Sequence, residues 1–147
     1  MVGVLVRTEI DAPTGRVWRE VSSIADHVTW MEDAVEIRFT SSRTSGVDTT
    51  FACETRIGPI ELTDHMRITE WVEGSVIGVE HTGVVRGTGR FTLAPTPDGR
   101  TVFSWDETLR FPWWLGGPVG EVSAAWVLRR VWRRNLDNLA ARVRARS

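Results

Sequence analysis

The amino-acid sequence predicts an α+β fold in which an antiparallel sheet of about seven strands packs against one long C-terminal helix. Three observations support this prediction: a strand that leads into two short helices, a β-rich middle with closely spaced turn signals, and a helical period at the end. With 147 residues, of which 41% are hydrophobic, the chain can build one core and is too short for two. We therefore expect a single domain over residues 1–147.

The N-terminal strand leads directly into a helix start. Its side chains alternate between two faces up to Ile10 and include many β-branched residues, which is typical of a strand. Pro13 then suits the first position of a helix, where its missing N–H costs nothing. The apolar side chains that follow at helical spacing are Val17, Val21 and Ile24. We expect a short helix with one buried face, and then a second short helix or capped turn before Trp30.

The middle of the chain is β-rich and is divided by turn signals. Gly58 and Pro59 form one such signal, Gly74 belongs to a second, and residues 95–99 form the strongest hairpin signal. The strands expected between these signals lie near residues 35–39, 49–57, 60–72, 76–82, 84–94 and 101–111. Because tight turns join most of these strands, the sheet should be antiparallel.

Helical periodicity returns after Pro112. Apolar side chains recur at spacings of 3, 4, 4, 3 and 4 residues, which places them on one stripe of a helix of roughly 25 residues. The stripe consists of Ala125, Leu128, Trp132, Leu136, Leu139 and Val143. A helix of this kind must bury its stripe, and we expect it to do so on the sheet that precedes it.

This order of elements resembles the helix-grip fold of the START-like superfamily, most closely its bacterial polyketide cyclase/dehydrase branch. The resemblance rests on residues 10–13 with Val17 and Trp18, on Trp30, on residues 67–70 before Gly74, on residues 99–101 before Trp105, and on the closing helix. It covers nearly the whole chain. It implies a curved sheet wrapped around the long helix, with a cavity between them that takes an apolar or aromatic ligand.

Aromatic side chains are the main candidates for the wall of such a cavity. The chain has eight tryptophans and no tyrosine, and large rigid rings serve either as core packing or as a surface for a flat ligand. The resemblance implies that Trp30 borders the cavity mouth, and Trp113 with Trp114 could form a flap over it. His81 shares a strand face with Ile77 and Val79, which favours an inward side chain. The residues expected to line the cavity are Trp30, Phe51, His81, Phe91, Trp105, Glu107, Trp113, Leu128 and Trp132.

His65 and Arg67 form the candidate catalytic pair. They lie two residues apart on one strand and so share a face of the sheet. The resemblance implies an inward arginine near Arg67, where it would stabilise an enolate while His65 moves a proton. Alternation gives the opposite interpretation, because it places the apolar side chains inward and leaves this pair in solvent unless a β-bulge reverses the phase. The apolar side chains in question are Ile60, Leu62, Met66 and Ile68.

The charge distribution leaves a role in docking open. Residues 118–147 carry seven arginines against two acids, whereas residues 1–117 carry eleven arginines against seventeen acids. The basic side chains are interpreted as the solvated face of the final helix. An interaction module that docks through this helix, or through Trp113 and Trp114, is an alternative that includes contact with a membrane surface. No nucleic-acid recognition motif accompanies the arginines, so no nucleic-acid partner is expected.

The remaining signals limit the classes of function. Cys53 is the single cysteine and cannot form an internal disulfide, and the histidines lack metal-ligand spacing, so neither a metal nor another cofactor is expected. No apolar run approaches the length of a membrane span, and a cytoplasmic monomer or homodimer is expected. The sequence therefore favours binding of a hydrophobic small molecule, such as a lipid, isoprenoid, quinone or polyketide. A polyketide cyclase or dehydratase that uses His65 and Arg67 is the enzymatic alternative.

Overall fold

The computed structural model describes residues 1–146. Its elements are β1 (Val2–Ile10), α1 (Thr14–Val21), the 3₁₀ helix η1 (Ile24–Thr29), β2 (Ala34–Phe39), β3 (Thr50–Ile57), β4 (Ile60–Val72), β5 (Val76–Thr82), β6 (Arg86–Pro95), β7 (Thr101–Arg110), the 3₁₀ helix η2 (Trp113–Leu115) and α2 (Gly117–Ala145). The predicted order of elements is confirmed. The bounds of β4 and β5 are as predicted, and the ends of the other predicted strands in the middle of the chain differ by at most two residues. Pro13 precedes α1 as its N-cap instead of opening it.

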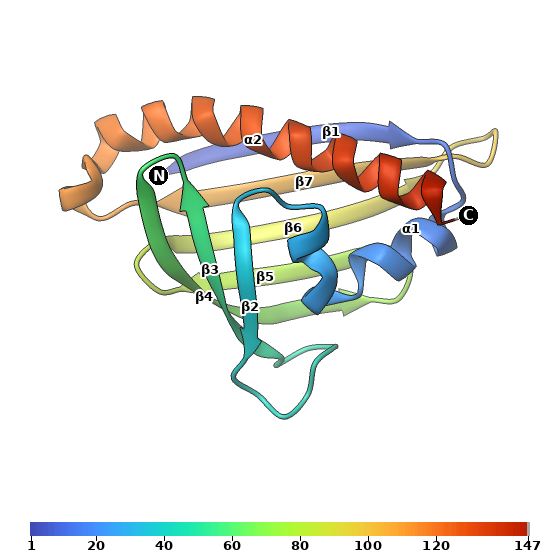
Figure 1. The fold of residues 1–147 in the computed structure, drawn as a ribbon, viewed down its shortest axis with the longest axis horizontal. Helices are drawn as coiled ribbons and strands as arrows, with labels where there is room; N and C mark the ends of the chain where they lie inside the picture. The colour runs from blue at the N-terminus through green and yellow to red at the C-terminus, as the bar shows by residue number, and fades with distance from the viewer. Residues whose placement is uncertain (147) are drawn as a thin grey trace.

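The strands form one antiparallel sheet with the order β1-β7-β6-β5-β4-β3-β2. Figure 1 shows β2 and β3 running across the direction of β1, β7 and β6, so the sheet is strongly curved. Two irregularities in the pairing accompany this curvature, one in β2 between Ala34 and Glu36 and one in β4 between Ile68 and Glu70. This architecture confirms the predicted fold class.

The long helix α2 lies against the concave side of the sheet (Figure 1). Every apolar residue of the predicted stripe is buried, from Ala125 to Val143. The helix packs chiefly on β1, with smaller contacts to β7, α1 and η2. Because α2 packs chiefly on β1, at one edge of the sheet, it does not cover the concave face of the strands from β3 to β5.

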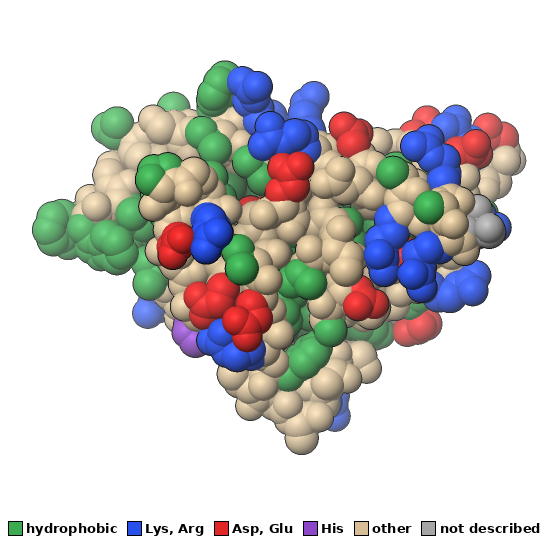
Figure 2. Space-filling model, in the orientation of Figure 1, with side chains coloured by type: hydrophobic (Ala, Val, Ile, Leu, Met, Phe, Trp, Pro, Cys, Tyr) green, Lys and Arg blue, Asp and Glu red, His purple; other side chains and the backbone are tan. Residues whose placement is uncertain are grey.

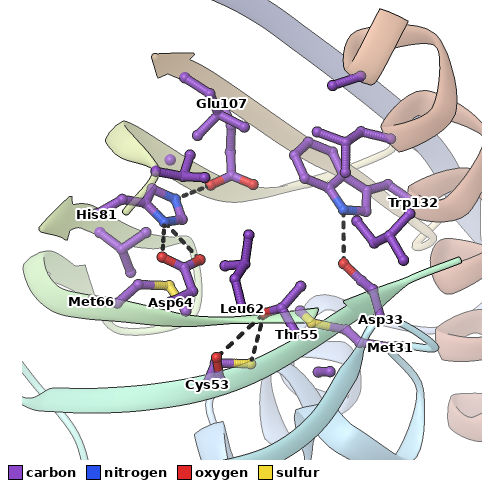
Figure 3. A pocket seen from close by; sticks show the side chains of 18 of the residues that line it. Met31, Asp33, Cys53, Thr55, Leu62, Asp64, Met66, His81, Glu107 and Trp132 are labelled. Atoms are coloured by element: carbon purple, nitrogen blue, oxygen red, sulfur yellow. Dashed lines mark hydrogen bonds and ion pairs between the residues drawn. The ribbon is translucent and has the colours of Figure 1, made fainter. Parts of the chain in front are cut away.

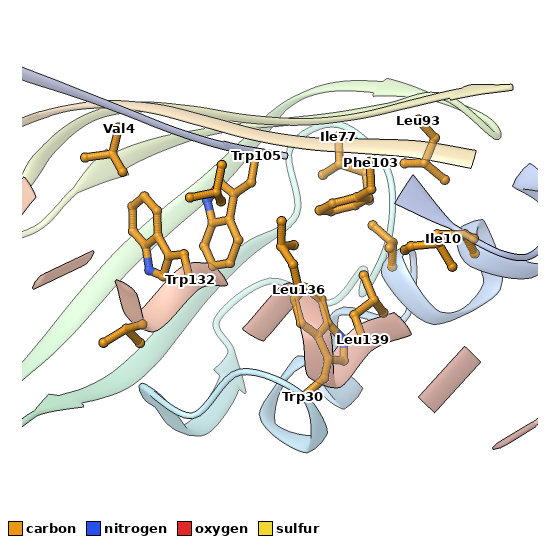
Figure 4. Packing of buried hydrophobic residues seen from close by; sticks show 14 of the residues in the cluster. Val4, Ile10, Trp30, Ile77, Leu93, Phe103, Trp105, Trp132, Leu136 and Leu139 are labelled. Carbon is orange, nitrogen blue, oxygen red and sulfur yellow. The ribbon is translucent and has the colours of Figure 1, made fainter. Parts of the chain in front are cut away.

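The hydrophobic core extends from this helix–sheet contact to the two short N-terminal helices. Val17 and Trp18 of α1 and Ile24 of η1 are buried in the same cluster as the α2 stripe. Figure 4 shows Phe103 of β7 and Leu139 of α2 in this cluster. No helix within residues 1–146 combines the length and the apolar character needed to cross a bilayer.

Leu139→Ala should destabilise the protein by about 2–5 kcal/mol, because Leu139 is 0% exposed and its removal leaves a cavity under α2. Val122→Ala on the same helix is the matched control. Val122 is 72% exposed, so its truncation should change the free energy of unfolding by no more than about 0.5 kcal/mol. Urea unfolding measures both. Equal losses in the two variants would contradict the position assigned to the buried stripe.

Candidate functional site

A cavity of about 560 Å³ lies between the concave face of the sheet and the first half of α2. Most of its wall is apolar and comes from η1, η2, α2 and the strands from β2 to β7. Seven of the residues predicted to line a cavity lie along this wall: Phe51, His81, Phe91, Trp105, Glu107, Leu128 and Trp132. They come from five different elements, so the sheet and the helix must assemble before the site exists.

Trp30 does not lie along the cavity wall, which corrects the prediction that it borders the mouth. Its side chain is 1% exposed and packs behind the wall, with its ring centroid 6.2 Å from that of Phe91 and 6.3 Å from that of Trp105. The reason is that η1 directs the ring into the core, where His27 also contacts it. Trp30 therefore supports Phe91 and Trp105, two of the aromatic rings that line the cavity. Figure 4 shows Trp30 beside Leu136 and Leu139 in the buried cluster.

Trp113 also lies outside the cavity, contrary to the prediction. It is 85% exposed, and Trp114 beside it is 58% exposed. The short helix η2 turns Leu115 towards the cavity and leaves both tryptophans in solvent. In a helix of one turn, neighbouring side chains point in different directions. So short a segment shows no hydrophobic periodicity, and the sequence therefore cannot indicate which of its side chains faces the cavity.

His65 and Arg67 lie on the outer face of the sheet, as alternation along the strand indicated. The inward orientation that the resemblance implied, and with it the catalytic role of the pair in the cavity, is corrected. Arg67 donates a hydrogen bond to Asp48 across 3.2 Å and lies 3.9 Å from Glu80, so its carboxylate partners are on the outside. The physical reason is uninterrupted alternation, because the irregularity in β4 begins only after Ile68. Leu62 and Met66 take the inward positions instead.

A polar cluster occupies one part of the cavity wall. His81 of β5 lies between two carboxylates: its Nδ1 is 3.0 Å from Oδ2 of Asp64 on β4, and its Nε2 contacts Oε1 of Glu107 on β7. The indole Nε1 of Trp105 donates a hydrogen bond to the other Glu107 oxygen, at 2.8 Å. Figure 3 shows the imidazole held between the two acids. We refer to Asp64, His81 and Glu107 as the His81 cluster.

Gly89 makes the contact between His81 and Glu107 possible. It lies on β6, paired with Val79 of β5 on one side and with Glu107 of β7 on the other. A Cβ atom at Gly89 would lie 2.5 Å from Oε1 and 2.8 Å from Cγ of Glu107, so any larger residue would push this carboxylate away. The missing side chain is thus the gap through which Glu107 reaches across β6 to His81.

The two carboxylates determine the protonation state of His81. Burial by itself lowers the pKa of the imidazole, but the negative charges of Glu107 and Asp64, and their hydrogen bonds to it, outweigh burial and raise the pKa to about 10. At neutral pH the ring is therefore an imidazolium ion, and both ring nitrogens are donors. The sequence pointed to His81 and Glu107 singly and contained no signal that would pair them with each other or with Asp64.

A second polar cluster fixes the aromatic wall from the other side. Asp33, between η1 and β2, accepts hydrogen bonds from Nδ2 of Asn135 at 2.7 Å and from Nε1 of Trp132 at 3.2 Å. Trp132 is stacked on Trp105, with ring centroids 4.4 Å apart and an interplanar angle of 13°. Burial raises the pKa of Asp33, although the hydrogen bonds from Asn135 and Trp132 oppose this. Sequence reasoning missed Asp33 and Asn135, because neither belongs to a motif.

His27 differs from His81 in charge although both line the cavity. Burial lowers the pKa of His27 to about 4, and a hydrogen bond to the carbonyl oxygen of Val21 and the charge of Asp26 offset this only in part. Its ring is therefore neutral at physiological pH. Within the described residues, no group of histidine, cysteine and carboxylate side chains has an arrangement that would hold a metal ion.

Comparisons with known proteins agree with this geometry. A family model described as polyketide cyclase/dehydrase and lipid transport matches residues 1–144. The solved structure of a START superfamily protein from Mycobacterium smegmatis has a TM-score of 0.82 at 13% identity, and the match covers 99% of each chain. Among the curated proteins, none matches this sequence.

Two further solved structures share the fold. A protein from Thermus thermophilus has a TM-score of 0.79 at 18% identity, with 99% of each chain covered. A protein from Nitrosospira multiformis has a TM-score of 0.73 at 17% identity, with 99% of this chain and 100% of that chain covered. At such identities the likeness concerns the arrangement of the backbone and says nothing about the contents of the cavity.

His81→Gln should abolish a loss of stability that the native protein shows at alkaline pH. The pKa of His81 is raised from 6.5 to about 10 on folding, so the folded state holds this proton more tightly than the unfolded chain does. The resulting stabilisation is complete below pH 6.5 and disappears as the pH rises towards 10. Urea unfolding at a series of pH values in this window measures it.

His65→Gln is the control for this experiment, since it removes an imidazole from the outer face of the adjacent strand. This variant should keep the alkaline loss of stability. The free energy of unfolding should fall more steeply with pH in the native protein than in His81→Gln. Equal slopes in the two proteins would show that the His81 cluster is not charged as described.

Proposed function

Because the chain belongs to the polyketide cyclase/dehydrase and lipid transport family, we propose that it binds a hydrophobic or aromatic small molecule between the sheet and α2. The observation that carries this proposal is the apolar cavity of about 560 Å³. A volume of this size lies within the range of about 300–1,000 Å³ that is usual for small-molecule sites. Lipids, isoprenoids, quinones and polyketides are the proposed ligand classes, because they are hydrophobic enough for an apolar cavity of this volume.

The aromatic wall favours a ligand with a flat apolar part. Trp105 and Trp132 are stacked on each other, and Phe91 meets Trp105 edge to face with ring centroids 5.1 Å apart. These rings are held by packing and by carboxylates, so little side-chain entropy is lost when a ligand contacts them. A rigid aromatic surface of this kind binds planar rings and isoprenoid chains by dispersion and by exclusion of water.

The ligand is proposed to enter between the β3–β4 turn and the start of α2. Both segments contribute wall residues that also reach the surface: Ile60 is 49% exposed and Val127 is 37% exposed. Leu115 of η2 lines the same region. Much of the remaining wall consists of buried or half-buried residues of paired strands, through which a ligand could not pass without unpairing the sheet.

Binding accounts for this geometry better than the cyclase mechanism that uses His65 and Arg67. Those two side chains are on the outer face, where they cannot touch a molecule in the cavity. The titratable groups within reach of a bound ligand belong instead to the His81 cluster and to Asp33. A non-covalent binding protein requires none of them to transfer a proton.

A second candidate function is docking on a lipid surface. The exposed apolar side chains of η2 and of the first turns of α2 form a patch, which Figure 2 shows as the hydrophobic end of the molecule. The patch consists of Trp113, Trp114, Val119, Val122 and Trp126, each 58–85% exposed. Arg130 lies over the Trp126 ring, 5.0 Å from its centroid. Exposed tryptophan beside arginine is typical of the interface between water and an anionic bilayer.

Ligand binding is tested with N-phenyl-1-naphthylamine, an uncharged probe whose fluorescence rises in apolar surroundings. The native protein should bind it saturably. Ala124→Trp, which places an indole on the α2 side of the cavity, should weaken binding by about tenfold or more because it fills the space that the probe occupies. Ala141→Trp, the same substitution at an exposed position of α2 outside the cavity wall and outside the patch, is the control and should bind as the native protein does. Equal binding by both variants would sink the proposal.

Docking is tested by flotation with liposomes of phosphatidylcholine alone or mixed with phosphatidylserine. The native protein should float with the anionic liposomes, less so at high salt. The double variant Trp113→Ala/Trp114→Ala should lose most of this binding. Val35→Ala is the control, because Val35 is 50% exposed on β2 and outside the patch. Absence of the native protein from both floated fractions would exclude lipid docking and leave the cavity proposal intact.

A further inference from the structure

The His81 cluster has more hydrogen-bond acceptors than donors. Two carboxylates offer about eight lone-pair sites. Among the described residues, the donors that the cluster receives are the two N–H groups of His81 and the indole N–H of Trp105. Each of these three donors is already bonded to a carboxylate oxygen. The cluster can therefore accept a further hydrogen bond from a ligand, but it has no N–H left to give.

The charge of the cluster is negative. With His81 protonated between Asp64 and Glu107, the sum over the three side chains is one negative charge. Asp33 is a further acid on the wall. Apart from His81 and the neutral His27, Arg90 is the one basic side chain along the part of the wall that the structure describes. Its guanidinium bonds both oxygens of Glu70 on the outer face, at 3.0 and 3.1 Å. No described side chain is thus placed to neutralise an anionic ligand.

The cluster is also accessible from the cavity. Asp64, His81 and Glu107 all line it, and the Asp64 side chain is 16% exposed, more than the 6% of His81 and the 7% of Glu107. The surrounding wall is apolar, with Met66 and Leu109 nearby. A buried carboxylate among apolar neighbours discriminates strongly between ligands with and without a hydrogen-bond donor. A ligand without a donor displaces the water that was bonded to the carboxylate and leaves the carboxylate oxygen without a partner.

We propose that the His81 cluster accepts a hydrogen bond from the ligand, so that the cavity selects apolar molecules with a hydroxyl group and rejects those with a carboxylate. This inference rests on the proposed function and specifies its ligand class. A phenol or alcohol presents its O–H to a carboxylate oxygen while its hydrocarbon part lies against Trp105 and Trp132. A carboxylate would meet a like charge and would find no free N–H group in the cluster.

Three naphthalenes that differ only at position 2 test this inference on the native protein. These are 2-naphthol, 2-methylnaphthalene, which replaces the hydroxyl by a methyl group of similar size, and 2-naphthoate. Dissociation constants at pH 7 come from displacement of N-phenyl-1-naphthylamine. We expect 2-naphthol to bind about tenfold more tightly than 2-methylnaphthalene, and 2-naphthoate to bind more weakly than either.

Glu107→Gln assigns the selectivity to the cluster. Without the negative charge of Glu107, the advantage of 2-naphthol over 2-methylnaphthalene should shrink and the binding of 2-naphthoate should improve severalfold. Glu80→Gln, on the same strand as His81 but on the outer face, is the matched control and should keep the native order. If Glu107→Gln does not fold, Asp64→Asn removes the same charge from the more exposed side of the cluster.

The outcomes separate this inference from the proposed function. If the native protein binds N-phenyl-1-naphthylamine but binds 2-methylnaphthalene or 2-naphthoate as tightly as 2-naphthol, the cavity is a binding site and the inference is wrong. The inference is equally wrong if 2-naphthol does not displace the probe, or if the charge-removing variant keeps the native order. If neither the probe nor any naphthalene binds, the proposed function itself fails.

Discussion

The stacking of Trp132 on Trp105 is the contact on which the rest of the cavity depends. It joins the middle of α2 to β7, with the two ring centroids 4.4 Å apart. Beyond this stack, towards the C-terminus, Leu136, Leu139 and Val143 are buried in the core. Before it, Leu128 faces the cavity. The stack thus marks the place where close packing ends, because the sheet curves away from a helix that rests chiefly on β1.

Carboxylates hold both indoles of this stack in place. Glu107 accepts the N–H of Trp105, and Asp33 accepts the N–H of Trp132. A buried indole N–H needs a partner, and a buried carboxylate needs several, so each acid is drawn into a further network: Glu107 with His81, and Asp33 with Asn135. The groups that orient the aromatic wall therefore also supply the polar character of the cavity.

The sheet separates two electrostatic environments. Its outer face carries ion pairs between exposed side chains, such as Arg67 with Asp48 and Arg90 with Glu70, which contribute little to stability in water. Its inner face carries few charges, and these are shielded from solvent. An unpaired carboxylate would be costly there, because burial removes its water without replacing the hydrogen bonds. Charged residues are common along the strands. They indicate a functional site only when they lie on the inner face, so the face must be known before a role is assigned.

The sequence by itself determined everything that depends on local periodicity. Alternation and turn signals located the strands, the spacing of apolar residues located the buried stripe of α2, and alternation along β4 indicated that His65 and Arg67 face outward. These features follow from φ/ψ geometry, which acts over a few residues. Only the tertiary structure decided that Trp30 packs behind the wall, that Trp113 lies in solvent, and that Asp64, His81 and Glu107 meet across β6 at a glycine. Such contacts depend on the curvature of the sheet and on the pairing of strands that are distant in the sequence. Neither produces a periodic pattern of residues from which it could be predicted.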